Sequence, residues 1–325
     1  MRNIKNDASF TIGIDIGGSS IKAGLVSTSG ELRNELLIAT DKENIEKLQS
    51  NVVQIIKKLS SDKFAISGIG IATTGIVDNK EGRILESTAI KNYNGMNWRQ
   101  FLSAYTSLNI VVENDVKSAA WGEYKYTNLS DTDTIALIAI GTGIGCGIVI
   151  NGSVYHGSTF AAGEIGYITI DFNGPPYLNN YGCLELYASA TSIVSFVKNS
   201  IEKSGGTEML KVVHGDINSI TVKEISQAEK LGDPLAIEAF SRAGEALGVG
   251  IVNLVHVLNP NAVILGGGVV DASNVFTNKA IEIAQQRILK TSRKNLEIRK
   301  AQLGNRAAII GAGLLAWEYN KGSLP

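Results

Sequence analysis

One sequence pattern occurs twice in this chain and constrains its fold more than any other feature. In residues 14–26, and again in residues 138–149, a short β-type run leads into a glycine-rich turn and a second β-type run. Each copy then reaches a tight turn, at Gly30 in the first and at Gly152 in the second. We interpret the copies as the openings of two similarly built halves, whose glycine turns face a shared cleft. The alternative is that any two glycine-rich hairpins look alike.

The length of the chain supports two domains, since a domain takes roughly 150 residues and the chain has 325. We expect an N-terminal α/β domain over residues 1–130 and a C-terminal α/β domain over residues 131–305. A helix expected over about residues 306–320 returns to pack on the first domain.

Hydrophobic periodicity alternates along the chain between the patterns of strands and helices, which is typical of α/β proteins. Helices are expected over residues 45–59, 114–126, 247–258, 278–289 and 306–319. Apolar runs predict strands at Thr11–Ile16, Lys22–Val26, Ile66–Ile71, Asn109–Val112, Thr134–Ile140, Ile148–Ile150 and Ala262–Leu265, and Gly141–Gly147 is expected to be a turn.

Composition excludes several classes of protein. The 30 Lys and Arg residues nearly balance 31 Asp and Glu, so the chain lacks the basic excess that favours nucleic-acid binding. Cys146 and Cys183 are too few for a disulfide framework and suit a reducing compartment. The start lacks the apolar core of a signal peptide, and the longest apolar stretch, residues 135–150, is too short to span a bilayer. We therefore expect a soluble, cytoplasmic protein that binds neither nucleic acid nor membranes.

The glycine turns are candidate phosphate sites, because backbone N–H groups approach phosphate oxygens closely where no Cβ intervenes. Two familiar nucleotide motifs do not account for them. The sequence G-x-x-x-x-G-K-[ST] does not occur. Gly311–Ala316 fits the dinucleotide pattern G-x-G-x-x-A, but too few residues follow it for a complete βαβ unit. A dinucleotide enzyme is therefore not expected.

Five motifs in order resemble one known family. They are Asp15-Ile-Gly-Gly-Ser-Ser-Ile-Lys22, Glu113-Asn-Asp-Val-Lys-Ser-Ala-Ala120, Gly141-Thr-Gly-Ile-Gly-Cys-Gly147, Gly163-Glu-Ile-Gly166 and Gly182-Cys-Leu-Glu185. Together they resemble the ROK family (repressors, open reading frames and sugar kinases), over nearly the whole chain. The resemblance implies a two-domain, actin-like (ribonuclease H-like) ATPase fold with a cleft. It also implies transfer of a phosphoryl group from ATP to the 6-hydroxyl of a hexose or derivative, such as glucose or N-acetylmannosamine.

The same resemblance implies how ATP and Mg²⁺ are bound. Asp15 follows the first strand, where an acidic residue would hold Mg²⁺ directly or through water. A turn-capping aspartate is the alternative. The predicted nucleotide contacts are Gly17, Gly18, Ser19, Lys22, Thr142, Gly143, Gly266 and Gly267.

Asp115 is the predicted catalytic base. As a sugar hydroxyl attacks phosphorus its proton must be accepted, and a positioned carboxylate doing so contributes about 10²–10⁴-fold in rate. The pair Asn114-Asp115 also starts a predicted helix, so a helix cap is the alternative. We expect the helix N-terminus to keep Asp115 ionised.

Sugar hydroxyls are well matched by carboxylate acceptors. The resemblance implies sugar contacts from both domains, made by Gly75, Thr88, Asn114, Asp115, Glu164, Tyr167 and Glu185. For Glu164 the alternative is an ordinary surface loop, and Trp98 is left open between the core and a sugar platform.

The chain departs from the ROK pattern where many members bind zinc. Those members have a histidine directly after G-E-x-G and three cysteines in the next loop. Here Tyr167 takes the histidine position, and Cys183 is the one cysteine in residues 173–183. One thiolate cannot supply the four ligands of structural zinc, so no zinc site is expected. We hypothesise that Tyr167, Tyr177 and Tyr181 pack the loop instead.

Two other functions come from different classes. ROK repressors carry an N-terminal DNA-binding region, whereas about ten residues precede the first predicted strand here, which disfavours a sugar-sensing transcriptional regulator. The sugar-binding motifs disfavour an actin-like ATPase without a sugar substrate. The resemblance further implies a homodimer. The sequence leaves open which sugar is the substrate and whether donors other than ATP serve.

Overall fold

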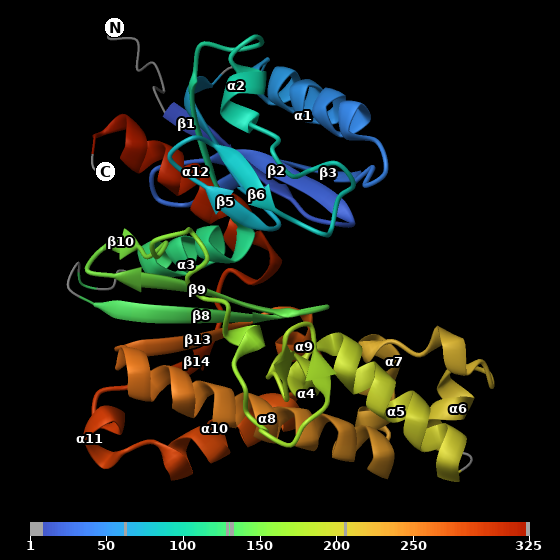
Figure 1. Cartoon of the computed structure of the whole chain (residues 1–325). Helices are drawn as coiled ribbons and strands as arrows, with labels where there is room; N and C mark the ends of the chain where they lie inside the picture. The colour runs from blue at the N-terminus through green and yellow to red at the C-terminus, as the bar shows by residue number, and fades with distance from the viewer. Residues whose placement is uncertain (1–8, 62–63, 128–129, 131–132, 205–206, 323–325) are drawn as a thin grey trace, which may run out of the picture. The chain divides into compact units, whose positions relative to one another are not determined.

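The computed structural model describes residues 9–61, 64–127, 130, 133–204 and 207–322, which form two compact units (Figure 1). The first unit combines the described parts of residues 1–133, 147–162 and 302–325, and the second combines residues 134–146 and 163–301. Residues 131 and 132, where the second domain is predicted to start, lie outside the described residues. The division near residue 130 stays a prediction.

The first unit contains a five-stranded sheet of order β3-β2-β1-β4-β7. Strands β1, β4 and β7 are parallel, while β1–β2 and β2–β3 are antiparallel hairpins. The parallel strands therefore end at one edge of the sheet, where ligands of open α/β sheets commonly bind. The bounds are β1 (Ser9–Ile16), β2 (Ser20–Val26), β3 (Leu32–Ala39), β4 (Ala65–Thr73) and β7 (Asn109–Asn114).

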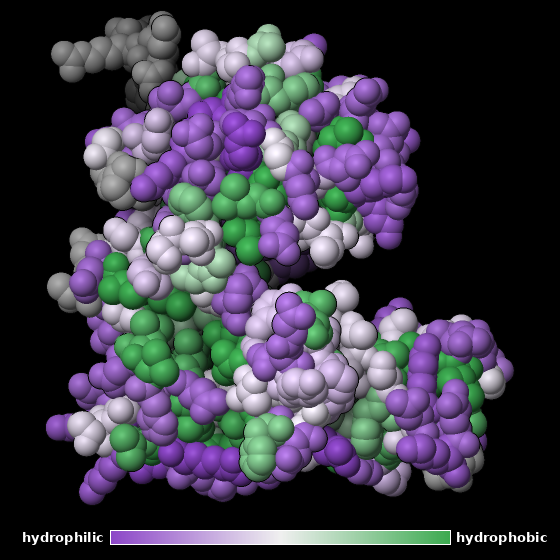
Figure 2. All heavy atoms as spheres, in the orientation of Figure 1, coloured by the Kyte–Doolittle hydropathy of each residue, from purple (hydrophilic) through white to green (hydrophobic). Residues whose placement is uncertain are grey.

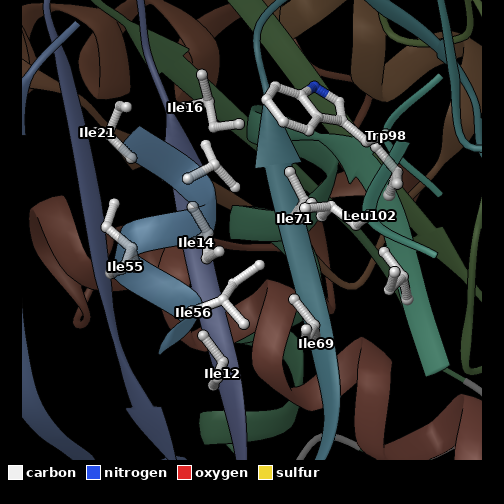
Figure 3. Close-up of a cluster of buried hydrophobic side chains, with 14 of the residues drawn as sticks. Ile12, Ile14, Ile16, Ile21, Ile55, Ile56, Ile69, Ile71, Trp98 and Leu102 are labelled. Carbon is white, nitrogen blue, oxygen red and sulfur yellow. The ribbon is translucent and has the colours of Figure 1, made fainter. Parts of the chain in front are cut away.

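Alternation along β1 gives this sheet two different faces. Ile12, Ile14 and Ile16 are fully buried on one face, where they meet helix α1 (Ile45–Ser60). Figure 3 shows these isoleucines beside Ile55 and Ile56 of α1. Since successive residues of a strand point to opposite faces, Thr11, Gly13 and Asp15 belong to the other face.

The same core also settles the position of Trp98. It begins α2 (Trp98–Leu102), is fully buried and lies beside Ile71 in Figure 3. Its indole N–H donates to the hydroxyl of Tyr93 at 2.8 Å. Trp98 is therefore a core residue and not a sugar platform. A small hairpin, β5 (Ile76–Asp78) and β6 (Arg83–Glu86), completes this side of the unit.

The opposite face of the sheet is covered by α12 (Ala307–Asn320), which also packs on α3 (Asp115–Tyr126). The backbones of the two helices pack directly against each other, because a Cβ atom on Gly311 would overlap the carbonyl of Ser118. The Thr11 hydroxyl in β1 donates to the Gly313 carbonyl at 2.8 Å. The Gly311–Ala316 segment, which fits a dinucleotide pattern by sequence, is therefore a helix-packing surface.

The second five-stranded sheet has the order β10-β9-β8-β13-β14, and β8, β13 and β14 are parallel. Its strands are β8 (Thr134–Ile140), β9 (Ile144–Ile150), β10 (Ser153–Val154), β13 (Ala262–Gly266) and β14 (Glu297–Lys300). Helices α8 and α10 lie on one side of its parallel strands (Figure 1). The described helices of the second unit are α4 (Glu185–Ala188), α5 (Ala190–Ser204), α6 (Glu208–Val212), α7 (Val222–Lys230), α8 (Pro234–Leu258), α9 (Gly268–Ala272), α10 (Asn274–Arg287) and α11 (Lys290–Arg293).

The expected turn over Gly141–Gly147 is wrong in its extent, because β9 already begins at Ile144. Glycine in a strand usually marks a close approach of another backbone. At Gly147, a Cβ atom would lie 2.5 Å from the carbonyl oxygen of Val116 in α3. Gly147 therefore serves strand–helix packing, and the turn is limited to residues 141–143.

In the described part of the chain no helix is both long and apolar enough to cross a membrane. On the face drawn in Figure 2, hydrophobic side chains appear in patches interrupted by hydrophilic ones.

Candidate functional site

In the first unit, the predicted site residues gather at the carboxyl edge of the parallel strands. These residues are Asp15, Gly17, Gly18, Ser19 and Lys22 around the β1–β2 turn, Gly75 and Thr88 in the loops after β4 and β6, and Asn114 with Asp115 at the end of β7. Because β1, β4 and β7 run in parallel, residues distant in sequence share this edge.

Asp15 lies at this edge with only 8% of its surface exposed. Lys22 is its cross-strand partner in β2, and the Lys22 Nζ lies 3.5 Å from the Asp15 Oδ2. Burial raises the pKa of Asp15, and the charge of Lys22 opposes that rise. Lys22 therefore compensates the charge of the buried carboxylate.

The first glycine turn is closed by a hydrogen bond from the Gly17 N–H to the Ser20 carbonyl at 3.0 Å. Thr40 directly follows β3, and its hydroxyl donates to the Gly17 carbonyl at 2.7 Å, which holds the turn in place. Ser19 is exposed at its tip. Thr88 is also exposed, and its neighbour Ala89 contacts the turn at Gly18.

Asn114 holds the catalytic candidate Asp115 in place. The Asn114 Oδ1 accepts from the N–H groups of Val116 and Lys117 at 3.0 Å each, which caps α3. The Asn114 Nδ2 donates to the Gly75 carbonyl at 2.9 Å and to the Asp115 Oδ1 at 3.0 Å. All four hydrogen-bonding positions of this amide are thus used. Its predicted contact with a sugar stays a prediction.

The electrostatics of Asp115 differ from the expectation of a strongly ionised carboxylate. Burial and the like charge of Asp15 raise the pKa of Asp115 to about 7, against the opposing hydrogen bonds from Val116 and Asn114. Desolvation disfavours the charged form more than the helix N-terminus favours it. A pKa near 7 is suitable for a general base, because such a group accepts and releases protons at neutral pH.

The second unit gathers its predicted site residues around the turn that follows β8. The Gly141 N–H donates to the Gly143 carbonyl at 2.9 Å and closes the turn. The start of α5 anchors it, since the Ala190 N–H donates to the Gly141 carbonyl and the Thr191 hydroxyl to the Thr142 carbonyl. Thr142 itself is exposed.

The Gly163-Glu-Ile-Gly166 motif is pressed onto the first residues of β9. Gly163 has a φ of +96°, and a Cβ there would overlap the Cys146 carbonyl. A Cβ on Gly166 would lie 2.6 Å from the Ile144 carbonyl oxygen. The two glycines therefore let this turn approach the strand, and Glu164 between them is exposed.

Glu185, the first residue of α4, joins these segments. Its Oε2 accepts from the Ile144 N–H at 2.7 Å, and its Oε1 accepts from the Tyr177 hydroxyl at 2.7 Å. The carboxylate also lies so close to Gly143 that a Cβ there would overlap it. Glu185 is therefore fixed directly against the glycine turn.

Gly266 ends β13 at the same sheet edge, since β13 is parallel to β8, and Gly267 follows it as the N-cap of α9. Beside them is a pocket of about 510 Å³, lined among others by Gly141, Thr142 and Gly268. Helix α7 supplies Lys223 and Gln227 to the wall. The contribution of α7 was missed by the sequence analysis, because its polar residues form no recognisable motif.

The residues present fit ATP and Mg²⁺. The pocket volume lies within the range of about 300–1,000 Å³ usual for ligand sites. A Cβ on Gly141 or Gly268 would meet no atom within 4 Å, so both glycines border open space. Asp15 offers hard carboxylate oxygens, and Mg²⁺ is commonly held by one or two carboxylates together with phosphates and water.

Among the described residues, no group of three or more His, Cys, Asp and Glu side chains could hold a metal. The expected lack of zinc stays a prediction. In the loop concerned, the rings of Tyr167 and Tyr177 are stacked with centroids 5.8 Å apart. Tyr181 is 59% exposed, so the hypothesis that three tyrosines pack this loop holds for two of them.

Comparison with known proteins extends these observations. A family model described as the ROK family matches residues 11–318. A glucokinase of Halalkalibacterium halodurans is 32% identical over 316 residues, covering 94% of each chain. A xylose repressor of Caldicellulosiruptor bescii is 29% identical, covering 95% of this chain and 78% of the repressor. The solved structure of a ROK family glucokinase from Streptomyces griseus, in complex with glucose and AMPPNP, matches with a TM-score of 0.82 and 30% identity, covering 95% of this chain and 99% of that one.

Proposed function

Because the chain belongs to the ROK family and has its actin-like ATPase fold, we propose that it is an ATP-dependent sugar kinase. The reaction is transfer of the γ-phosphoryl group to the primary 6-hydroxyl of a hexose or derivative, such as glucose or N-acetylmannosamine. The similarity to two glucokinases, one of them solved with glucose and AMPPNP, supports this proposal.

One observation carries the proposal furthest, and it concerns Asp115. Its carboxylate is held by the Asn114 amide and the Val116 N–H at the carboxyl edge of a parallel sheet. Its pKa of about 7 makes it a competent proton acceptor at neutral pH. A helix cap needs no such pKa, whereas a general base that works at neutral pH benefits from it.

The roles of the other residues follow from their chemistry. Bound ATP with Mg²⁺ would supply the transferable phosphoryl group and neutralise part of its charge. Asp15 would hold the metal, and Lys22 is paired with its carboxylate. The backbone N–H groups of both glycine turns would donate to phosphate oxygens. Glu164 and Glu185 would accept hydrogen bonds from sugar hydroxyls, and Asp115 would accept the proton of the reacting hydroxyl.

The proposal includes three features of the whole protein. The functional halves divide near residue 130, and each contributes one glycine turn to the bound nucleotide. The protein acts as a homodimer. It works in the cytoplasm, where ATP and reduced thiols are available.

An ADP-release assay over a panel of sugars tests the proposed reaction. The panel contains glucose, mannose, fructose, N-acetylmannosamine, N-acetylglucosamine and β-glucosides. We expect Mg²⁺-dependent ADP release with at least one of them, and Asp115→Asn should lower kcat by at least about 10²-fold. AMPPNP affinity should stay within about threefold, because the substitution keeps the side-chain shape.

Asp216→Asn is the matched control, since Asp216 caps a short 3-10 helix at an exposed position in the second unit. This variant should retain wild-type kcat. A near wild-type rate in Asp115→Asn would remove Asp115 from the role of base.

A sugar-binding transcriptional regulator is the second candidate, because a xylose repressor is similar over 95% of this chain. The sugar panel separates the two functions. Sugar binding without phosphoryl transfer to any sugar would favour the regulator.

A further inference from the structure

The loop over residues 171–183 is organised by a network of tyrosines in the second unit. It contains the hairpin of β11 (Pro176–Tyr177) and β12 (Asn180–Tyr181). The Asn180 side-chain amide donates to the Tyr167 carbonyl at 2.9 Å, and the Cys183 thiol approaches the same carbonyl at 3.4 Å. The hairpin is therefore tied to the segment that follows Glu164.

Tyr177 occupies the centre of this network. Its ring stacks on that of Tyr167, with an angle of 25° between the planes. Its hydroxyl donates to the Glu185 Oε1 at 2.7 Å. The Tyr177 side chain thus contacts both Tyr167 and Glu185, two residues that are predicted to bind the sugar.

Glu185 would be poorly defined without this contact. Its Oε2 is fixed by the Ile144 N–H, but a single hydrogen bond to one oxygen leaves the carboxylate plane free to turn. The Tyr177 hydroxyl fixes the second oxygen. A Cβ on Gly143 or Gly166 would come within 3.2 Å of the carboxylate, so these two glycines let Glu185 lie directly against the backbone.

We propose that Tyr177 is a positioning residue for sugar binding, which orients Glu185 through its hydroxyl and Tyr167 through its ring. This inference rests on the proposed sugar kinase function. Each oxygen of Glu185 keeps one further lone pair after its bond to Ile144 or Tyr177. Those lone pairs are directed by Tyr177 to receive vicinal sugar hydroxyls.

The charge state of the pair agrees with this role. The hydrogen bond and charge of Glu185, together with burial, raise the pKa of Tyr177 above its ordinary value. The phenol therefore stays protonated at every pH at which the enzyme would work, and it remains the donor of this hydrogen bond.

The chain itself offers a matched control. Tyr187 also donates its hydroxyl to a carboxylate, the Asp171 Oδ2, at 2.9 Å. This bond ties α4 to the same loop, but it does not involve Glu185. Tyr187→Phe therefore removes an equivalent tyrosine–carboxylate bond without the proposed positioning.

The experiment measures steady-state kinetics of Tyr177→Phe and Tyr187→Phe with the best sugar found for the wild type. Tyr177→Phe should raise the KM for sugar roughly tenfold, as expected when one hydrogen bond to a charged group is lost. Its KM for ATP should change less than about twofold. Tyr187→Phe should leave both values within about twofold. Tyr177→Leu should raise the sugar KM further, because it also removes the ring that supports Tyr167.

A double-mutant cycle with Glu185→Gln tests whether Tyr177 acts through Glu185. The tenfold effect of Tyr177→Phe should shrink to less than about threefold in the Glu185→Gln background. Equal sugar KM values for Tyr177→Phe and the wild type, or full additivity in the cycle, would overturn the inference. A wild type that phosphorylates no sugar would instead contradict the proposed function, so the two failures are distinguishable.

Discussion

At the residue scale, Asp15 and Asp115 of the first unit have different environments, which suit the different roles proposed for them. Asp15 is paired with Lys22, whereas Asp115 is contacted by neutral donors of Asn114 and Val116. Where the environments of two titratable groups push their pKa values apart, the two groups often have different roles in the reaction. Here the charge-compensated carboxylate suits a metal ion, and the carboxylate held by neutral donors suits proton transfer.

The pKa of Asp115 leads to a prediction about pH. Only the ionised carboxylate can accept a proton, so kcat/KM should fall as the pH drops through about 7. Below that pH the loss should approach tenfold per unit, as for a single essential base. Rates measured from pH 5.5 to 9 at subsaturating ATP and sugar check this. The residual activity of Asp115→Asn should lack this dependence, and a wild-type profile that stays flat down to pH 5.5 would contradict it.

Individual residues of the candidate site could be predicted from the sequence, but the hydrogen bonds among them could not. Glu113-Asn-Asp was singled out by its resemblance to a ROK motif, and the structure places it where β7 ends and α3 begins. The full use of the Asn114 amide depends on the Gly75 carbonyl, which lies 39 positions away in the chain. Tyr177 likewise matters to the candidate site because its hydroxyl donates to Glu185, and no local sequence pattern specifies that hydrogen bond.

At the element scale, α3 carries Asp115 at its first residue and is held at its middle by α12. The helices touch through Gly311, opposite the Ser118 carbonyl. At the far end of α3, the Glu123 carboxylate accepts from the N–H groups of Gln302 and Leu303 at 2.7 and 2.6 Å. The orientation of Asp115 thus depends on contacts made along the length of its helix.

Gly311→Ala should therefore destabilise the protein and reduce its activity. The added methyl group forces α3 and α12 apart, and overpacking of this kind costs about 1–3 kcal/mol. We expect a lower Tm by thermal unfolding and a lower kcat per folded molecule. The control is Ala308→Ser, which adds one atom at a half-buried position of the same helix. Equal stability of the Gly311→Ala variant and the wild type would show that the helices are not tightly packed.

Elements with strong periodicity were predicted well, and elements rich in glycine were not. The apolar face from Ile45 to Leu59 predicts α1, which is observed at Ile45–Ser60. The hairpin signal Asn151-Gly152 is confirmed, with positive φ at both residues. The start of β9 was misplaced because its glycines look like turn residues locally. At Gly147 the actual cause is the approach of α3, which lies outside any local window.

At the scale of the whole molecule, the first unit is discontinuous in sequence. It takes described residues from the chain's beginning, from 147–162 and from 302 onwards. Lys117 of α3 donates to the Phe160 carbonyl at 2.8 Å, and Glu113 of β7 lies 2.6 Å from the His156 Nε2. Segments that are distant in sequence therefore complete one fold, which periodicity alone cannot reveal.

A fragment of residues 1–133 should consequently fail to fold cooperatively. It contains β1 to β7 but lacks α12, so one face of the sheet stays uncovered. Thermal unfolding followed by circular dichroism should show no sharp transition. The same fragment joined through a flexible linker to residues 302–325 should regain one. Cooperative unfolding of the unlinked fragment would contradict this prediction.

The position of α12 in the chain also affects how the protein is made. All residues of the second unit precede α12, whose first residue is Ala307. Because the ribosome synthesises a chain from its N-terminus, N-terminal domains generally fold first. Here the unit begun first can be finished only last, so one face of the nascent sheet stays uncovered while the other unit is being translated. Chaperones that bind newly synthesised chains have that whole interval in which to act on it.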